Sequence, residues 1–389
     1  MTPAARVQAA IGLLDEIFAG APAEKALTGW ARRARFAGSK DRAAVRDHVF
    51  DALRRRVSAL PEGADETGRN LMLGLLAQDG ADIAALFGGA GYGPPALEPQ
   101  EGALLADIAG PGARPDIPAW IAPLLQGALA GEMAAVIEAM RHRAPVFLRV
   151  NLARITRDSA VEALAREEIS TRISTLSDSA LEVVAGARRI AASSPYRDGL
   201  VELQDASSQA AVESLPLAEG MRILDYCAGG GGKTLAMGGR VRADFFAHDA
   251  HAARMRDLPV RAERARLRVS LLEALQLKVE SPFDLVFCDV PCSGSGTWRR
   301  TPDAKWRFSR PDLDSLLALQ QKIVQQAEGL VSHDGVLAYA TCSLLREENE
   351  DQVARFLSER PDWQCLSLRR WSPVDGCDGF FLAQLTRKA

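Results

Sequence analysis

The stretch FDLVFCDVPCSGSG, residues 283–296, joins an apolar run to a turn rich in glycine and serine. Its first six residues are typical of a buried strand, so Cys292 follows the point where the chain leaves a sheet. A second apolar run, 335–339, ends in the same way and delivers Cys342. In doubly wound α/β sheets, ligands bind beyond the carboxyl ends of the strands. We therefore expect both cysteines at one edge of a mostly parallel sheet.

A third strand end carries a glycine-rich loop. The strand-like run 221–227 leads into the loop AGGGGK, residues 228–233. The loop is not a Walker A motif, because that motif needs a glycine at the position of Cys227. A glycine-rich turn between a strand and a helix still lets the backbone approach a nucleotide-like cofactor closely. Asp249 ends the next strand-like run, where an acid can accept hydrogen bonds from ribose hydroxyls. These features predict a cofactor that contains a nucleoside.

The composition is that of an ordinary globular protein. The 389 residues are 47% hydrophobic and 25% charged, with room for two or three domains. No run approaches the roughly 18 apolar residues of a membrane span, and Asp15 and Glu16 interrupt what would be the apolar region of a signal peptide. The six cysteines lack the paired spacing of disulfide or zinc sites. His248 and His251 flank Asp249 and are interpreted as neighbours of a cofactor, not as metal ligands. We expect a monomeric cytoplasmic protein with reduced thiols, no metal and no membrane contact.

Three regions differ in pattern. Residues 1–140 show helical spacing of apolar residues and no candidate catalytic group. Residues 141–199 contain short strand-like runs and a helix with Thr156 as its N-cap. Residues 200–389 alternate strand-like and helical segments, which is typical of a mostly parallel sheet covered on both faces. We predict an α/β fold with an all-helical N-terminal domain, a small α+β subdomain and a nucleotide-binding sheet domain. The α+β subdomain could contact RNA or only pack against the sheet.

Two stretches are locally basic although the net charge is −3. Between Trp30 and Arg56 there are nine Arg or Lys residues against three Asp. This pattern fits either phosphate binding or a solvated helix face. The second stretch, TWRRTPDAKWRFSR at residues 297–310, directly follows the Cys292 turn. Its position favours phosphate binding near the predicted site.

Several motifs together resemble one family. CAGGGGK at residues 227–233, DVPCSGSG at 289–296, RRTPDAKW at 299–306 and ATCS at 340–343 are similar to motifs of the RsmB/Sun-type RNA cytosine-5 methyltransferases. The resemblance extends upstream to PVFLRVN and LVELQDASSQAAVESL and covers most of residues 144–389. SKDRAAVRDHVFDALRRR is loosely similar to part of the NusB-like helical domain of RsmB-type members. The resemblance implies a Rossmann-like methyltransferase domain that uses S-adenosylmethionine.

The resemblance also implies roles for individual residues. Cys342 would be the nucleophile, and Cys292 would assist release of the product. Asp289 would hydrogen-bond the cytosine or the cofactor, and Lys233 would stabilise charge on the base or act only in the structure. A helix expected to begin near Arg346 would favour the thiolate of Cys342 through its dipole. The implied catalytic and cofactor residues are Cys342, Cys292, Asp289 and Lys233, and Cys227, Ala228, Gly229, Gly230, Gly231, Gly232, Lys233, Asp249 and Asp289.

The implied reaction is methylation of carbon 5 of a cytosine in RNA, through a covalent cysteine adduct, with small-subunit ribosomal RNA as the expected target. The chain departs from the family in two places. Four glycines occupy the cofactor loop, where Ala-Pro is usual, and only Glu273 is available as the acid near adenine. A DNA cytosine-5 methyltransferase is an alternative, against which Cys342 and the preceding domains argue. A non-catalytic ribosome-assembly factor is another, and the presence of both cysteines, Asp289 and Lys233 argues against it.

Overall fold

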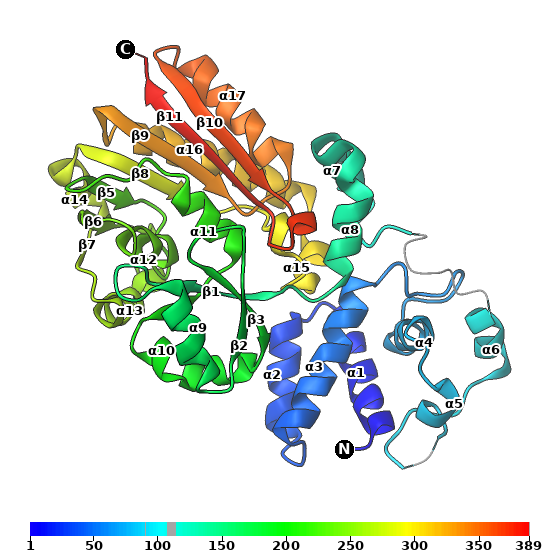
Figure 1. The fold of residues 1–389 in the computed structure, drawn as a ribbon. Coiled ribbons are helices and arrows are strands. Elements are labelled where there is room, and N and C mark those ends of the chain that lie inside the picture. Colours follow the sequence, from blue (N-terminus) through cyan, green and yellow to red (C-terminus); the bar gives the residue numbers. More distant parts are fainter. Residues whose placement is uncertain (90, 107–113, 389) are drawn as a thin grey trace. The chain divides into compact units, whose positions relative to one another are not determined.

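The computed structural model describes residues 1–89, 91–106 and 114–388 (Figure 1). The chain divides into two compact units. The first, here called the helical unit, comprises Met1–Gln126, Ala130–Arg143 and Trp298–Phe308. The second, here called the sheet unit, comprises Gly127–Leu129, Ala144–Thr297 and Ser309–Ala389. One segment of the helical unit, Trp298–Phe308, is therefore far along the chain from the rest of that unit.

The helical unit has its core between three helices, α1 (Pro3–Phe18), α3 (Ser39–Arg54) and α4 (Gly68–Gln78). Its buried cluster includes the side chains that helical spacing singles out, such as Leu14 of α1 and Val49 of α3. The predicted helical character of this region is confirmed. The other helices are α2 (Ala23–Arg33), α5 (Ile83–Leu86), α6 (Pro99–Ala106), α8 (Met133–Arg141) and α15 (Pro302–Arg307), together with α7 (Ala122–Leu129), whose last three residues are assigned to the sheet unit.

In the basic segment Trp298–Phe308, the cations Arg299 and Lys305 are buried in the helical unit, so the predicted phosphate binding is wrong for these two side chains. Lys305 is 2% exposed and donates to Asp116 O (2.7 Å) and Arg54 O (3.2 Å). Burial lowers the pKa of Lys305 to about 7. Arg299 is also buried, and its carbonyl accepts from Arg54 Nε (2.8 Å). The Lys305 ammonium binds backbone carbonyls inside the protein because it has been removed from solvent.

The two halves of the first basic stretch have different surroundings. In its second half, arginines of the helical unit form ion pairs, among them Arg55 with Asp79 (2.7 Å) and Arg56 with Glu66 (2.5 Å). In its first half, basic side chains are exposed around the loop between α2 and α3, where the Phe36 ring is 77% exposed. These exposed cations are Arg32, Arg33, Arg35, Lys40 and Arg42.

The sheet unit contains a seven-stranded sheet with the order β10-β11-β9-β8-β5-β6-β7 (Figure 1). The strands from β9 to β7 in this order run parallel, and β11 and β10 add antiparallel pairs. The prediction of a mostly parallel sheet is confirmed. The strands are β5 (Arg222–Asp225), β6 (Asp244–Ala247), β7 (Val269–Leu271), β8 (Phe283–Asp289), β9 (Val331–Thr341), β10 (Trp363–Trp371) and β11 (Phe380–Arg387).

Helices cover both faces of this sheet. On one face, Val286 and Leu337 pack with Phe356 in a cluster that also contains side chains of α16. On the other face, Ile223 and Leu285 pack with side chains of α11 and α12. Since β5 has β6 on one side and β8 on the other, the chain reverses direction across the sheet at β5, where ligands bind in such folds. The helices are α11 (Ala206–Glu213), α12 (Gly232–Gly238), α13 (Leu258–Ala265), α14 (Ala274–Glu280), α16 (Arg310–Glu328) and α17 (Glu350–Glu359).

A small antiparallel sheet with the order β2-β3-β1-β4 forms the α+β part of the same unit. Thr156 caps the helix that crosses it by accepting from Ser159 N–H (3.2 Å), as predicted. The strand β4 is only three residues long and carries no apolar run that sequence periodicity could detect. The elements are β1 (Val146–Val150), α9 (Arg157–Ala165), β2 (Ser170–Ile173), β3 (Ala180–Ala185), α10 (Ser194–Arg197) and β4 (Val201–Leu203). Among the described residues, no helix has both the length and the apolar character of a membrane span.

Candidate active site

The pairing of β8 with β9 brings the two predicted cysteines together. The strands are parallel neighbours with Asp289 opposite Ala340, so the loops that follow them leave the same edge of the sheet. Gly296 N–H donates to Cys342 O (2.9 Å), which ties one loop to the other. The sulfur atoms of Cys292 and Cys342 are 3.4 Å apart. Both side chains are only partly buried, so the pair is enclosed but still accessible.

The two thiols have different surroundings. The hydrogen bond with Cys342, burial and the nearby carboxylate of Glu348 raise the pKa of the Cys292 thiol well above its ordinary value. Cys292 therefore keeps its proton and can donate its S–H to the sulfur of Cys342. The helix expected near Arg346 is not found there. The chain forms a 3-10 turn at Arg346–Glu348, and the α-helix α17 begins only at Glu350.

Glu348 is a buried residue of this site that sequence reasoning missed. Its carboxylate accepts from Ser293 N–H (2.8 Å) and from the Gln320 amide (2.9 Å). It also accepts from the hydroxyls of Ser293 and Ser343. The surrounding sequence REENED has the composition of an exposed helix start, so the single sequence contains no signal that this one acid is buried.

Lys233, the last residue of the glycine loop, reaches toward the cysteine loops. Its ammonium forms an ion pair with Asp289, the last residue of β8. Burial lowers the pKa of Lys233, but Asp289 and Cys342 together raise it above its ordinary value. The ammonium also lies 5.2 Å from the centre of the Phe380 ring. Lys233 is therefore a permanent cation on the Cys342 side of the site.

The glycine loop between β5 and α12 has the shape of a cradle for a ligand. Gly231 has a φ of +76°, and a Cβ added there would lie 2.1 Å from Leu258 Cδ1. Asp225 Oδ2 accepts from Thr234 N–H (3.1 Å) and Oγ1–H (2.6 Å), which fixes the start of α12. Asp225 Oδ1 is buried and has no hydrogen-bond partner among the described residues. Burial raises the pKa of Asp225 to about 7.

Two arginines hold the loop from outside. Arg149 of β1 is buried and donates to Gly232 O (2.7 Å) and Gln204 Oε1 (2.6 Å). Arg261 of α13 donates to Gly230 O. These bonds fix the loop carbonyls, which compensates for the freedom that four consecutive glycines give the chain. The loop is therefore shaped before a ligand arrives.

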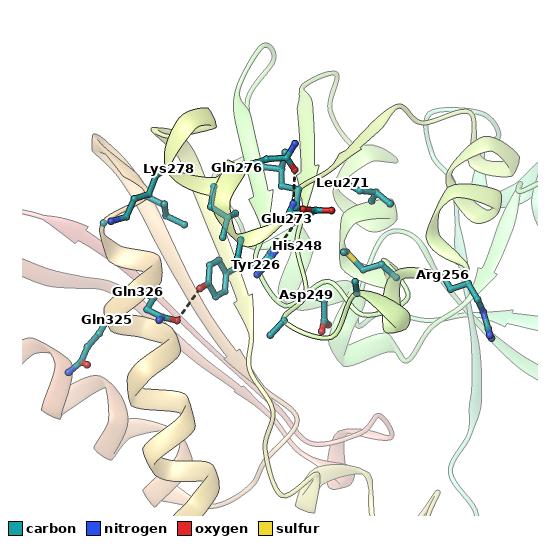
Figure 2. Close-up of a pocket in the computed structure, with 18 of the residues that line it drawn as sticks. Tyr226, His248, Asp249, Arg256, Leu271, Glu273, Gln276, Lys278, Gln325 and Gln326 are labelled. Atoms are coloured by element: carbon teal, nitrogen blue, oxygen red, sulfur yellow. Dashed lines mark hydrogen bonds between the residues drawn. The ribbon is translucent and has the colours of Figure 1, made fainter.

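A cavity of about 1170 Å³ adjoins the start of this loop (Figure 2). Asp249, which is 5% exposed, lines it, and its two oxygens accept from Gly229 N–H (3.0 Å) and His251 N–H (2.9 Å). Glu273, the acid that the sequence offers near the adenine, lines the same cavity and so lies on the wall of the candidate cofactor site. The cavity, the glycine cradle and an acid at the end of β6 fit a nucleoside-containing cofactor.

The remaining sulfur and histidine side chains have other surroundings. Burial and the nearby carboxylates, Asp225 first, raise the pKa of Cys227, so this loop thiol stays protonated. Cys288 is fully buried in the core, as predicted. His248 lines the cavity, and its Nδ1 lies 2.9 Å from Leu272 O. In the described part of the chain, no group of three or more His, Cys, Asp or Glu side chains could hold a metal ion.

Comparison with known proteins gives a consistent result. Residues 212–386 match the family described as 16S rRNA methyltransferase RsmB/F, and residues 117–188 match the ferredoxin-like domain of RsmF/B-like methyltransferases. The chain is 33% identical over 309 residues to ribosomal RNA small subunit methyltransferase B of Cronobacter sakazakii, covering 74% of this chain and 70% of that protein.

Solved structures share the fold. The crystal structure of PH0851 has a TM-score of 0.74 at 20% identity and covers 100% of this chain and 99% of that chain. NSun6 from Pyrococcus horikoshii with SFG has a TM-score of 0.61 at 16% identity and covers 69% of this chain and 98% of that chain. On the evidence of the Cronobacter relative and the family match, the chain belongs to the 16S rRNA methyltransferase RsmB/F family, whose methyl donor is S-adenosylmethionine.

Proposed function

We propose that this protein methylates carbon 5 of a cytosine in small-subunit ribosomal RNA through a covalent adduct between Cys342 and the base. The observation that carries the proposal is the pair of sulfur atoms 3.4 Å apart at the ends of β8 and β9. The pair lies beside Lys233, which belongs to the glycine loop of the cofactor site. The name of the Cronobacter relative supports the choice of RNA.

The chemistry requires an activated base. Carbon 5 of cytosine is a weak nucleophile, and covalent catalysis replaces one difficult step by easier ones. The Cys342 thiolate forms a bond to carbon 6, and the electrons of the 5,6 double bond move to carbon 5, which becomes nucleophilic. S-adenosylmethionine, when bound, supplies an electrophilic methyl group. Transfer of the carbon 5 proton to a water molecule and cleavage of the Cys342–carbon 6 bond then restore the double bond, and the bonding electrons leave with sulfur as the thiolate.

Neighbouring groups divide this work between the two cysteines. Cys292 keeps its proton in the free site and stabilises the Cys342 thiolate by donating an S–H hydrogen bond. After methyl transfer, Cys292 assists the elimination that frees the product. Lys233 stabilises the thiolate and the negative charge that develops on the base. Asp289 fixes the direction of the lysine ammonium through their ion pair.

The cofactor residues follow from the cradle and the cavity. We propose that the glycine loop from Cys227 to Lys233 and Asp289 hold the methionine part of S-adenosylmethionine. Asp249 would accept hydrogen bonds from the ribose hydroxyls, and Glu273 would lie near the adenine. The target base has to leave its stack before Cys342 can reach its face, so single-stranded or locally opened RNA is the substrate.

Residues 1–140 are proposed as an RNA-docking domain, followed by the α+β subdomain 141–199 and the catalytic domain 200–389. The exposed cations and the Phe36 ring between α2 and α3 support this assignment, because single strands bind to basic surfaces with exposed aromatic rings.

The adduct provides the test. Cys292→Ala should accumulate a protein–RNA adduct that survives denaturing electrophoresis, in the presence of S-adenosylmethionine and the small-subunit RNA. Cys342→Ala and the double variant should form none. A Cys292→Ala protein that turns over without an adduct would contradict the role assignment. Adduct formation with duplex DNA in place of RNA would indicate a DNA methyltransferase, and failure to bind S-adenosylmethionine would indicate a non-catalytic assembly factor.

A further inference from the structure

Glu348 joins the two cysteine loops through one carboxylate. Its side chain is 0% exposed. Oε1 accepts from Ser293 N–H and from the Gln320 amide, while Oε2 accepts from the hydroxyls of Ser293 and Ser343. Ser293 directly follows Cys292, and Ser343 directly follows Cys342. A single oxygen atom therefore bridges the residues next to the two reactive sulfurs.

The four donors to this carboxylate are neutral groups. An ionised carboxylate has about four acceptor sites, and these bonds use them, whereas a protonated carboxyl would give one of them up. Burying a charge without a cation beside it is unfavourable unless hydrogen bonds replace the lost water. The hydrogen bonds that compensate for burial of this charge are all made with α16 and the cysteine loops, so the charge and the loop geometry depend on each other.

The same network holds the chain on both sides of each cysteine. The Gln320 amide also donates to Pro291 O (2.9 Å), just before Cys292. Asn349, beside Glu348, contacts Thr341 Oγ1 (2.5 Å) and donates to Ser343 O (2.9 Å), which lie on either side of Cys342. Neither cysteine loop can shift without breaking a bond to this buried pair of residues.

We infer that Glu348 is a positioning residue that sets the distance between the two sulfurs and keeps the proton on Cys292. This inference rests on the proposed function, because it explains how two thiols of the same kind take different parts in one reaction. The bridge keeps the loops in register, and the negative charge favours the neutral thiol of Cys292. Lys233 acts in the opposite sense on the Cys342 side.

Other ionisable groups also face the cysteine pair. Tyr339 of β9 interacts electrostatically with Cys292 and Glu348, and its hydroxyl donates to Glu348 O (2.6 Å). Lys233 of α12 and Asp289 of β8 stand on the Cys342 side. The Tyr339 hydrogen bond is made to the Glu348 backbone, and the Lys233–Asp289 ion pair does not involve Glu348. A change in the reactivity of Cys292 when only the Glu348 side chain is replaced can therefore be assigned to that carboxylate.

The test is thiol alkylation of the full chain without RNA or cofactor. Wild type and Glu348→Gln are treated with iodoacetamide from pH 6 to 10, and each cysteine peptide is quantified by mass spectrometry. Cys365 is exposed and gives the reference rate, while Cys288 is buried in the core and reports unfolding. Glu347→Gln is the matched control, since it removes a neighbouring charge that pairs with Arg310 (2.8 Å), outside the cysteine loops.

In Glu348→Gln, alkylation of Cys292 should move to lower pH and become about tenfold faster at pH 8 relative to Cys365, with Cys288 still protected. Methyl transfer should fall about tenfold or more, with unchanged affinity for S-adenosylmethionine. Alkylation and turnover equal to those of Glu347→Gln would overturn the inference. If Cys288 also reacts, the Glu348→Gln variant has unfolded, and Ser343→Ala replaces it as the test because it removes one hydrogen bond of the bridge. Ser343→Ala should increase the alkylation rate of Cys292 by less than about tenfold. An unchanged alkylation rate would again overturn the inference. Absence of any RNA adduct in Cys292→Ala would instead count against the proposed function.

Discussion

The Cys292 loop and the Cys342 loop end neighbouring strands and begin with the same dipeptide, Cys-Ser, but their surroundings differ. The Cys292 loop turns on glycines, and Gly296 has no room for a side chain, because an added Cβ would lie 2.4 Å from Gly379 O. The Cys342 loop is anchored by two buried leucines, Leu344 and Leu345. A carboxylate stands beside the first thiol and an ammonium near the second. Under the proposed function, the neighbouring charge, and not the thiol itself, assigns each cysteine its task.

The proposed difference between the two cysteines is tested most strongly by removing the sulfur of Cys342. Cys342→Ala should lower methyl transfer by roughly 10³-fold or more, because it removes the group that activates the base. Binding of S-adenosylmethionine, measured by calorimetry, should not change. A Cys342→Ala enzyme with substantial turnover would mean that the two loops have exchanged roles.

Oxidation should couple the two loops. A disulfide needs sulfurs about 2.0 Å apart, a small movement from the observed 3.4 Å. Treatment with the thiol oxidant diamide should therefore remove two free thiols per chain and nearly all activity, and dithiothreitol should restore both. Cys292→Ala and Cys342→Ala serve as controls in which these two thiols cannot be lost together. A wild-type thiol count that does not fall would show that the loops lie farther apart in solution.

Removing the cation of Lys233 should affect the Cys342 loop and not the Cys292 loop. Lys233→Met should lower turnover by roughly 10–100-fold, because the thiolate and the developing charge on the base lose a preorganised ammonium. Alkylation of Cys342 should slow while that of Cys365 is unchanged. Lys322→Met, a substitution of a lysine on α16 outside this network, is the matched control. Equal effects of the two substitutions would argue for a purely structural role of Lys233.

The glycine loop can be compared with the two cysteine loops through its buried Asp225, whose replacement should have the smallest effect. Burial raises the pKa of Asp225 to about 7, whereas an aspartate in an unfolded chain titrates near about 3.9. Between these pH values the folded chain binds a proton that the unfolded chain lacks, so the free energy of unfolding falls as the pH rises toward 7. The stability that the neutral carboxyl allows is present at low pH and is lost as the pH rises through 7. The Tm of Asp225→Asn minus that of wild type should therefore rise by a few degrees from about pH 4 to pH 7 and then level off. A pH-independent difference would contradict the raised pKa.

Much of the fold can be predicted from the sequence because burial leaves a periodic record. The apolar runs that became β8 and β9 are long enough to identify, and the residue after each run marks the sheet edge. Thr156 was identifiable as a cap because a hydroxyl just before a helix has one favourable use. The strands β4 and β7 could not be predicted, because three residues are too few to show a hydrophobic period. Their pairing with longer neighbouring strands defines them.

The site was predictable where backbone geometry demands a residue type, and not where tertiary packing decides. Glycines, strand-end acids and cysteines are visible in sequence because the turns and the chemistry require them. Lys305 and Glu348 look like solvated charges, and only the assembled structure encloses them. The local sequence around both residues is rich in charge, so it does not indicate that contacts with distant parts of the chain bury these two side chains.

The helical unit has a consequence for how the protein is made. Because Trp298–Phe308 fills part of its interior, this unit lacks one of its own pieces until most of the polypeptide has emerged from the ribosome. The amino-terminal part of the chain cannot mature first and wait for the rest. Dividing the gene after residue 143 would yield an amino-terminal fragment with an incompletely filled core. The other fragment would carry Trp298 and Trp306 without the helices that they pack against. Expression of either fragment alone should give aggregation-prone material.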